Sequence, residues 1–202
     1  MSESSLSIIK SALRRALLAQ RQDLTSSNRN VAEMKMVDRL SGFLTTRPWR
    51  SYAVFLPWRG EPDLTEVWNR MHEDGYTLAL PTCLADRKTM QMRSWLLTSP
   101  LEKDALGLPA PAASAKPILC DAWIVPCLGV GPCGERLGAG MGFYDRAMAA
   151  LGPGQRPATI GVCFESGRVQ TPFAEPHDLL LDACLTEAGI EHFKPPNEAY
   201  RA

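Results

Sequence analysis

Residues 125–146 of the chain, VPCLGVGPCGERLGAGMGFYDR, join an apolar strand to a helix through a loop rich in glycine. The apolar run 122–128 predicts a buried strand, and residues 143–151 predict a helix. Six of the fifteen glycines lie between them. Glycine adopts positive φ easily and lets the backbone approach a ligand, while the first turn of a helix offers unpaired N–H groups to an anion. The stretch therefore predicts a phosphate-binding loop at the end of a strand.

Two charged residues extend this interpretation. Arg136 would supply a planar guanidinium for phosphate oxygens, and Asp145 would hold a magnesium ion beside them. The glycine spacing matches neither the Gly-x-x-x-x-Gly-Lys-Ser/Thr pattern nor the Gly-x-Gly-x-x-Gly pattern of common nucleotide-binding loops. The alternative is a flexible strand-to-helix turn whose glycines only relieve backbone strain. We favour the phosphate site because arginine, glycine, tyrosine and aspartate gather directly after one strand.

The rest of the chain alternates between helical and strand-like patterns. Apolar residues at helical spacing predict helices over residues 6–20, 27–44 and 61–74. Apolar runs predict strands over 52–56, 77–81, 90–95, 159–164 and 183–186, and a proline- and alanine-rich segment predicts a loop over 106–115. This alternation predicts one α/β domain over residues 1–202, with a mostly parallel sheet flanked by helices on both faces. Ligands of such sheets bind beyond the carboxyl ends of the strands.

Composition excludes several classes of function. The 202 residues carry a formal net charge of zero and form no basic patch, which argues against nucleic acid or an anionic membrane as a partner. No apolar run approaches the roughly 20 residues of a membrane-spanning helix, and the first residues do not resemble a signal peptide. The six cysteines form no Cys-x-x-Cys pair. We therefore expect a cytoplasmic protein with free thiols in a reducing compartment.

The glycine loop resembles the signature of the 5-formyltetrahydrofolate cyclo-ligase family, also called methenyltetrahydrofolate synthetases. That signature reads Arg-Leu-Gly-x-Gly-x-Gly-Tyr-Tyr-Asp and usually follows a Val-Pro segment, as Val125-Pro126 stand here. The resemblance implies an ATP- and Mg²⁺-dependent ligase that closes 5-formyltetrahydrofolate into 5,10-methenyltetrahydrofolate and releases ADP and phosphate. In the loop, the resemblance implies these ATP-binding residues: Arg136, Leu137, Gly138, Ala139, Gly140, Met141, Gly142, Phe143 and Tyr144.

Lys10 and Arg14 lie four residues apart and so share one face of the first predicted helix. By itself such a pair is most often a solvated basic face. The resemblance implies a different role, because the family places Lys-x-x-x-Arg near its N-terminus, where both charges reach ATP.

The resemblance also implies where the folate and the metal bind. Leu56, Glu61 and Tyr144 would contact the folate, since a carboxylate can accept hydrogen bonds from the N–H groups of a pterin edge. Asp145 and Asp178 would hold Mg²⁺. Asp178 lies in the segment Pro176-His177-Asp178, and an aspartate that caps a turn is an equally good interpretation of it.

The chain departs from the family pattern at several positions. Ala110 stands where the family usually has a glutamate, Val130-Gly131 replace Phe-Asp, Met141 replaces a lysine or glycine, and Phe143 replaces a tyrosine. If that glutamate helps to hold the folate, its absence predicts weaker folate binding, which Ala110→Glu would strengthen. If a residue elsewhere already fills the gap, the added charge would be neutral or harmful. The main alternative is a catalytically weak or regulatory folate- or nucleotide-binding protein. A sugar-phosphate isomerase is a second alternative, but the sequence shows no acid–base pair placed for enolisation. We expect a monomer that binds small molecules.

Overall fold

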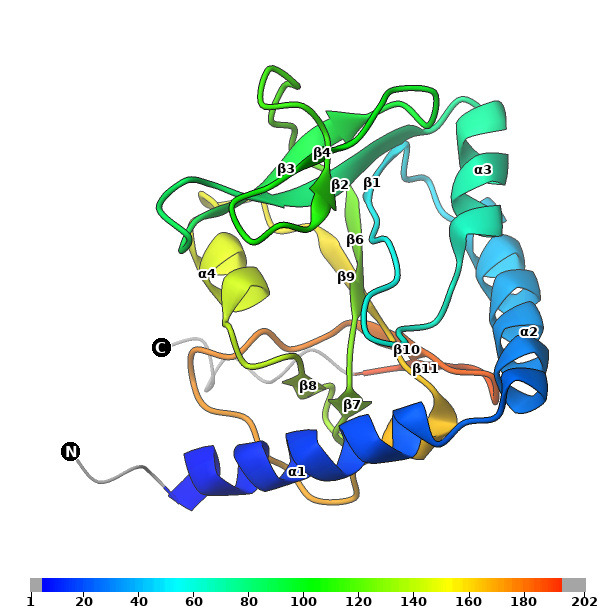
Figure 1. Ribbon diagram of the computed structural model, residues 1–202, viewed down its shortest axis with the longest axis vertical. Helices are drawn as coiled ribbons and strands as arrows, with labels where there is room; N and C mark the ends of the chain where they lie inside the picture. Colours follow the sequence, from blue (N-terminus) through cyan, green and yellow to red (C-terminus); the bar gives the residue numbers. More distant parts are fainter. Residues whose placement is uncertain (1–4, 194–202) are drawn as a thin grey trace.

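The computed structural model describes residues 5–193 and is built around a seven-stranded sheet (Figure 1). The strand order is β11-β10-β9-β6-β1-β2-β3, with β3 and β11 antiparallel at the two edges and the other strands parallel. The strands of this sheet are β1 (Ser51–Ala53), β2 (Thr77–Cys83), β3 (Met90–Trp95), β6 (Ala122–Pro126), β9 (Ala158–Val162), β10 (Ala183–Leu185) and β11 (Ile190–His192). The prediction of a mostly parallel α/β sheet is confirmed.

Helices cover both faces of the sheet, as predicted. They are α1 (Ser5–Gln22), α2 (Ser26–Thr45), α3 (Thr65–Glu73) and α4 (Phe143–Ala149), with a short 3-10 helix η1 (Glu165–Gly167). Side chains of α2 and α3 pack with Ile124 of β6 on one face. Trp123 and Val125 point to the opposite face, where Tyr144 and Ala147 of α4 cover them. Because β6 is buried on both faces, its sequence reads as an apolar run without alternation.

Helix α1 covers no sheet face but lies across the carboxyl ends of the strands, beside β7 and β8 (Figure 1). Leu17 anchors it by packing with Leu137, Val169 and Phe173 in a separate apolar cluster. The opposite side of the helix is solvated, with Ile8 and Ile9 about half exposed. This placement turns one face of α1 toward the loops that follow the strands.

Several local predictions were wrong, each for a structural reason. The glycine-rich segment contains a hairpin of β7 (Gly129–Val130) and β8 (Arg136–Leu137), and the predicted loop 106–115 contains β5 (Pro109–Ala110), which pairs with β4 (Glu102–Lys103). Helix α3 begins at Thr65 and not at residue 61, because the chain turns at Arg59 and Gly60, both at positive φ. The predicted strand 52–56 leaves the sheet after Ala53.

The strands that follow β1 and the strands that follow β6 are added to the sheet in opposite directions. From β1 it moves to β2 on one side, whereas from β6 it moves through β9 to β10 on the other side. The segments that follow β1 and β6 therefore diverge at the carboxyl ends of two neighbouring strands. Such a switch point is where open α/β sheets bind ligands.

Candidate functional site

A cavity of about 610 Å³ opens at this switch point. The segment after β1 forms one wall, and the glycine loop after β6 forms another. Helix α1, the segment around Asp178, and a wall from β2, the start of β3 and residues 104–109 line the rest of the cavity. Among the residues predicted to form the site, Lys10, Arg14, Leu56, Glu61, Asp145 and Asp178 all line it, together with Arg136, Gly138, Ala139, Gly140, Met141, Gly142, Phe143 and Tyr144. Leu137 does not line it and is instead buried in the apolar cluster beneath α1.

The glycines of the loop are required by the backbone and by neighbouring arginines. Gly140 has a φ of +93° and Gly142, the N-cap of α4, has a φ of +64°. At Gly138 a Cβ atom would lie 2.7 Å from a guanidinium nitrogen of Arg136. The Arg14 Nε donates a hydrogen bond to the Gly138 carbonyl at 3.0 Å. Two guanidinium groups thus converge on a loop that only glycine can form, which is a suitable arrangement for a polyanion.

Arg136 is held in place from two sides. Its Nε and Nη2 donate to the Pro126 carbonyl at 3.2 and 3.0 Å, at the end of β6. Its guanidinium carbon lies 4.6 Å from the centre of the Tyr144 ring, in a cation–π contact. Burial raises the pKa of Tyr144, so the phenol keeps its proton at neutral pH and remains a hydrogen-bond donor. Arg136 is therefore a positioned charge between the glycine loop and the segment that carries Glu61.

Lys10 is buried and is not part of a solvated face. Its Nζ lies 2.7 Å from the Glu175 Oε2 and 2.5 Å from the Asp178 Oδ2. Burial opposes the charged form, but the hydrogen bonds to Asp178 and Glu175 outweigh it, and the pKa of Lys10 is raised above its ordinary value. The ammonium group is therefore fully charged at neutral pH. Glu175 is a site residue that the sequence interpretation missed.

The two aspartates predicted to bind metal come from distant parts of the chain but lie near each other. The Asp145 Oδ1 accepts a hydrogen bond from the backbone N–H of Leu179 at 2.9 Å, directly after Asp178. Within residues 5–193, the Asp145 Oδ2 and the Asp178 Oδ1 accept no hydrogen bond, although the His177 Nε2 lies 4.0 Å from the Asp178 Oδ1. Potential ligand atoms of Glu175, His177 and Asp178 also lie within 4.8 Å of one another. That group offers ligands of the kind a hard cation such as Mg²⁺ takes, but it does not include Asp145, and the Lys10 ammonium already contacts both of its carboxylates.

Glu61 occupies the other end of the cavity. Its Oε2 accepts a hydrogen bond from the backbone N–H of Trp58 at 3.1 Å, which closes the turn after β1. Burial raises the pKa of the carboxyl group to about 7, against the opposing effects of that hydrogen bond and of the charges of Arg21 and Arg136. Leu56 and Trp58 form apolar wall beside it. The result is a hydrogen-bond acceptor in an apolar pocket, suited to a flat, partly polar ring.

Most departures from the family pattern lie outside the cavity. Ala110 is buried in β5, 1% exposed, and does not line the cavity. Leu108 and Pro109 just before it line the cavity, whereas a glutamate at position 110 itself would place a charge in a packed position; the effect of Ala110→Glu on folate binding stays a prediction. Val130 and Gly131 are buried in packing, and a Cβ at Gly131 would meet the Glu135 carboxylate at 2.5 Å. Only Met141 and Phe143 face the ligand space.

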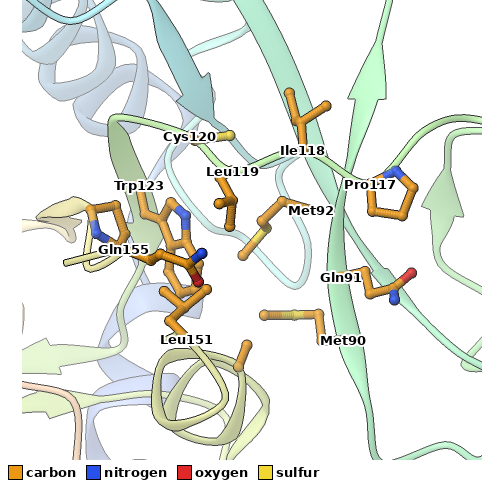
Figure 2. Close-up of a pocket in the computed structure, with 12 residues that line it drawn as sticks. Met90, Gln91, Met92, Pro117, Ile118, Leu119, Cys120, Trp123, Leu151 and Gln155 are labelled. Carbon is orange, nitrogen blue, oxygen red and sulfur yellow. The ribbon is translucent and has the colours of Figure 1, made fainter. Parts of the chain in front are cut away.

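A second cavity of about 190 Å³ lies between β3, the segment before β6 and the end of α4 (Figure 2). Its walls are mostly apolar, with Met92, Trp123 and Leu151 pointing into it. No charged side chain lines it within the described part of the chain. This cavity therefore lacks the groups that a phosphate or a metal ion needs, and Met90 separates it from the larger one.

None of the helices in residues 5–193 is long and apolar enough to cross a membrane.

Comparisons with known proteins agree on one family. The model of the 5-formyltetrahydrofolate cyclo-ligase family matches residues 7–187. A 5-formyltetrahydrofolate cyclo-ligase of Mycoplasma pneumoniae is 23% identical over 179 residues, covering 88% of this chain and 98% of the relative. The enzyme of that name from Mycolicibacterium smegmatis is 29% identical over 184 residues, covering 88% and 93%.

Solved structures show the same fold. The 5,10-methenyltetrahydrofolate synthetase of Mycoplasma pneumoniae superposes with a TM-score of 0.69 at 21% identity, covering 88% of this chain and 98% of that one. The 5,10-methenyltetrahydrofolate synthetase of Aquifex aeolicus gives a TM-score of 0.78 at 22% identity, covering 94% and 95%.

Proposed function

The chain belongs to the 5-formyltetrahydrofolate cyclo-ligase family, and we propose that it uses ATP to close 5-formyltetrahydrofolate into 5,10-methenyltetrahydrofolate. One observation carries the proposal beyond the family name. A single cavity joins a loop suited to phosphate, with Arg14 and Arg136, to an apolar pocket containing Glu61. A ligase that transfers a phosphoryl group between two substrates needs both subsites in contact.

The formyl oxygen of an amide leaves poorly as hydroxide, so the enzyme first has to phosphorylate it. The formyl oxygen attacks the γ-phosphorus of ATP, the bond from that phosphorus to the bridging oxygen breaks, and ADP leaves. The N10 nitrogen then attacks the formyl carbon, the carbon–oxygen bond breaks, and phosphate departs with the N10 proton. No protein nucleophile is required. The protein positions the two substrates and neutralises the phosphate charge.

The residues divide between these tasks. Lys10, Arg14 and Arg136 supply positive charge, and the backbone from Gly138 to Tyr144 supplies N–H groups to the phosphates. Leu56, Glu61 and Tyr144 bind and orient the folate ring. Asp145 and Asp178 would hold Mg²⁺, which would neutralise charge on the phosphates when bound. The Lys10 Nζ lies 2.5 Å from the Asp178 Oδ2, so Mg²⁺ would compete with this ammonium for Asp178.

The free cysteines support a reducing compartment. All six are unbonded, and the Sγ atom of Cys163, directly after β9, lies 3.8 Å from that of Cys184 in β10 without a disulfide. We infer a cytoplasmic enzyme that acts as a monomer on small molecules.

The proposal is tested by measuring ADP release from the purified chain with ATP, with and without 5-formyltetrahydrofolate. A ligase releases ADP only when the folate is present, in a one-to-one ratio with the cyclised product. A binding protein of this fold would bind both ligands and release no ADP above background, and that result would overturn the proposal.

A further inference from the structure

Arg21 is a buried arginine that the reaction scheme above does not use. It lies in the last turn of α1, is 7% exposed, and lines the large cavity. Its Nε and Nη1 have no hydrogen-bond partner among the described residues. Buried guanidinium donors are rarely left unsatisfied, since each such group costs free energy in the absence of a partner. Arg21 lines the cavity and carries two buried donors that have no protein partner, and this combination points to a ligand that reaches the guanidinium.

The position of Arg21 follows from the period of α1. Lys10, Arg14, Leu17 and Arg21 are spaced by four, three and four residues, so they share one helix face. Leu17 anchors that face in the apolar cluster, and the three charged side chains line the cavity. Lys10 and Arg14 lie toward the glycine loop and its neighbours, as their contacts with Asp178 and Gly138 show. Arg21 lies at the other end of the row.

Arg29 of α2 fixes Arg21 beside the turn that carries Glu61. Its Nη2 donates to the Arg21 carbonyl at 2.9 Å, and its Nη1 donates to the Gly60 carbonyl at 2.8 Å. One planar guanidinium thus joins the end of α1 to the residue before Glu61. The Arg29 guanidinium also lies 5.0 Å from the centre of the Phe164 ring, which limits its movement.

Arg21 and Glu61 are close enough to influence each other but form no ion pair in the described chain. Burial lowers the pKa of Arg21 and raises that of Glu61, while the charge of each residue opposes the shift of the other. The Nε and Nη1 of Arg21 have no partner among the described residues, and the Glu61 carboxylate uses only its Oε2, for the Trp58 backbone N–H. Arg21 and Glu61 together would fit a planar ligand whose acceptor atom, bound by Arg21, lies next to N–H donors bound by Glu61.

We propose that Arg21 is a substrate-binding residue that donates a hydrogen bond to the ring carbonyl oxygen of the pterin, beside the N–H groups accepted by Glu61. This inference rests on the proposed function. The tetrahydropterin ring carries its carbonyl directly beside a ring N–H, so a donor–acceptor pair recognises that edge and not its apolar face. Arg21 would then contribute to the affinity and selectivity for the folate and not to the binding of ATP.

The unsatisfied donors also predict a stability signature. A buried guanidinium without a partner destabilises the free protein, and a ligand that hydrogen-bonds to it removes that penalty. A structural arginine would behave in the opposite way, because its loss would remove native contacts. The variant Arg21→Met keeps the apolar stem of the side chain and removes only the charged group.

The test compares the parent chain with Arg21→Met, Arg21→Lys and the control Arg70→Met, which removes an exposed arginine of α3. Calorimetric titration gives the Kd for 5-formyltetrahydrofolate, for its analogue with an amino group in place of the ring carbonyl, and for ATP. Thermal unfolding is measured with and without the folate. If Arg21→Met does not fold, the same measurements are made on Arg21→Lys, which retains the positive charge but not the guanidinium group.

We expect Arg21→Met to weaken folate binding by about 10- to 100-fold, leave the Kd for ATP within about twofold, and unfold at the same or a higher temperature without ligand. The parent prefers the carbonyl ligand to the amino analogue, and the variant loses most of that preference. Arg70→Met changes none of these values. A variant with parental folate affinity, or one that is less stable yet equally selective, contradicts the role of Arg21. Failure of the parent itself to bind the folate contradicts the proposed function instead.

Discussion

Asp145 and Glu61 are both carboxylates of one cavity, yet their surroundings suit them to different tasks. Asp145 keeps one oxygen in a hydrogen bond to the Leu179 backbone and has its other oxygen available. Glu61 lies in an apolar pocket in which burial raises its pKa to about 7. A carboxylate with a free oxygen suits a metal ion, whereas a buried carboxyl group with a raised pKa suits a ligand whose hydrogen bonds favour its charged form.

The substitution Asp145→Asn tests the metal assignment. The amide oxygen of asparagine can still accept the Leu179 hydrogen bond, so we expect the unfolding temperature to stay within a few degrees of the parent. Turnover at saturating Mg²⁺ should fall at least about 100-fold, since even outer residues of metal sites cost 10- to 100-fold when changed. Activity is measured as a function of Mg²⁺ concentration. An unchanged Mg²⁺ requirement with full activity would show that Asp145 has only a structural role.

The raised pKa of Glu61 predicts how the stability of the free protein depends on pH. The ordinary value is 4.5 and the folded value is about 7, so between them the folded chain binds more protons than the unfolded chain. Stability therefore decreases as pH rises through this window and does not recover above it. Chemical denaturation of the parent and of Glu61→Gln across the window measures the effect. The glutamine variant should lack this part of the pH dependence.

Folate binding should have the opposite pH dependence. The carboxylate accepts pterin N–H groups and the protonated form does so poorly, so affinity should rise roughly tenfold from about pH 6 to about pH 8. Glu61→Gln should bind weakly at both values with little pH dependence. A parent whose folate affinity does not change over this range would contradict the assignment of Glu61.

The glycine loop acts as one element, because its backbone conformation and the arginines above it depend on each other. Gly140 has a φ of +93°, and a Cβ there would lie 3.2 Å from the Arg14 Nε. We expect Gly140→Ala to lower stability by about 1–2 kcal/mol and to weaken ATP binding by displacing Arg14. The free energy of unfolding and the Kd for ATP are measured on the same preparation.

Gly154 provides the matched control for this prediction. It also has a positive φ, of +75°, but no atom lies within 4 Å of the position of its Cβ, and it does not line the cavity. Gly154→Ala should cost similar stability and leave ATP binding unchanged. If the two alanine variants weakened ATP binding equally, the loop would not act through Arg14.

The spacing of apolar residues predicted the helices and strands well where the burial of one or both faces requires apolar side chains. The apolar run of β6 and the spacing of α1 and α2 marked those elements to within a few residues. Elements held by only a few residues could not be found. The hairpin of β7 and β8 has two residues per strand and lies inside a glycine loop, so no alternation marks it. The start of α3 depends on the turn at Arg59 and Gly60, which positive φ values determine.

At the scale of the whole molecule, the site is assembled from segments that are far apart in sequence. Lys10 meets Asp178 across 168 positions, and Arg14 meets Gly138 across 124. The family resemblance predicted most of these residues singly, but no spacing in the sequence predicted their contacts. Arg21 shows the difference. The spacing of residues in the sequence places Arg21 on the same helix face as Lys10 and Arg14. Only the structure shows that Arg21 is buried and that two of its donors lack a partner.

The central claim is that one cavity brings ATP and 5-formyltetrahydrofolate together for ring closure. The most direct measurement is the absorbance of 5,10-methenyltetrahydrofolate during incubation of the chain with 5-formyltetrahydrofolate, ATP and Mg²⁺. Product should accumulate only when protein and ATP are both present, and Asp145→Asn should largely abolish it. Absence of product from the folded parent chain, with both ligands shown to bind, would mean that the cavity does not catalyse ring closure.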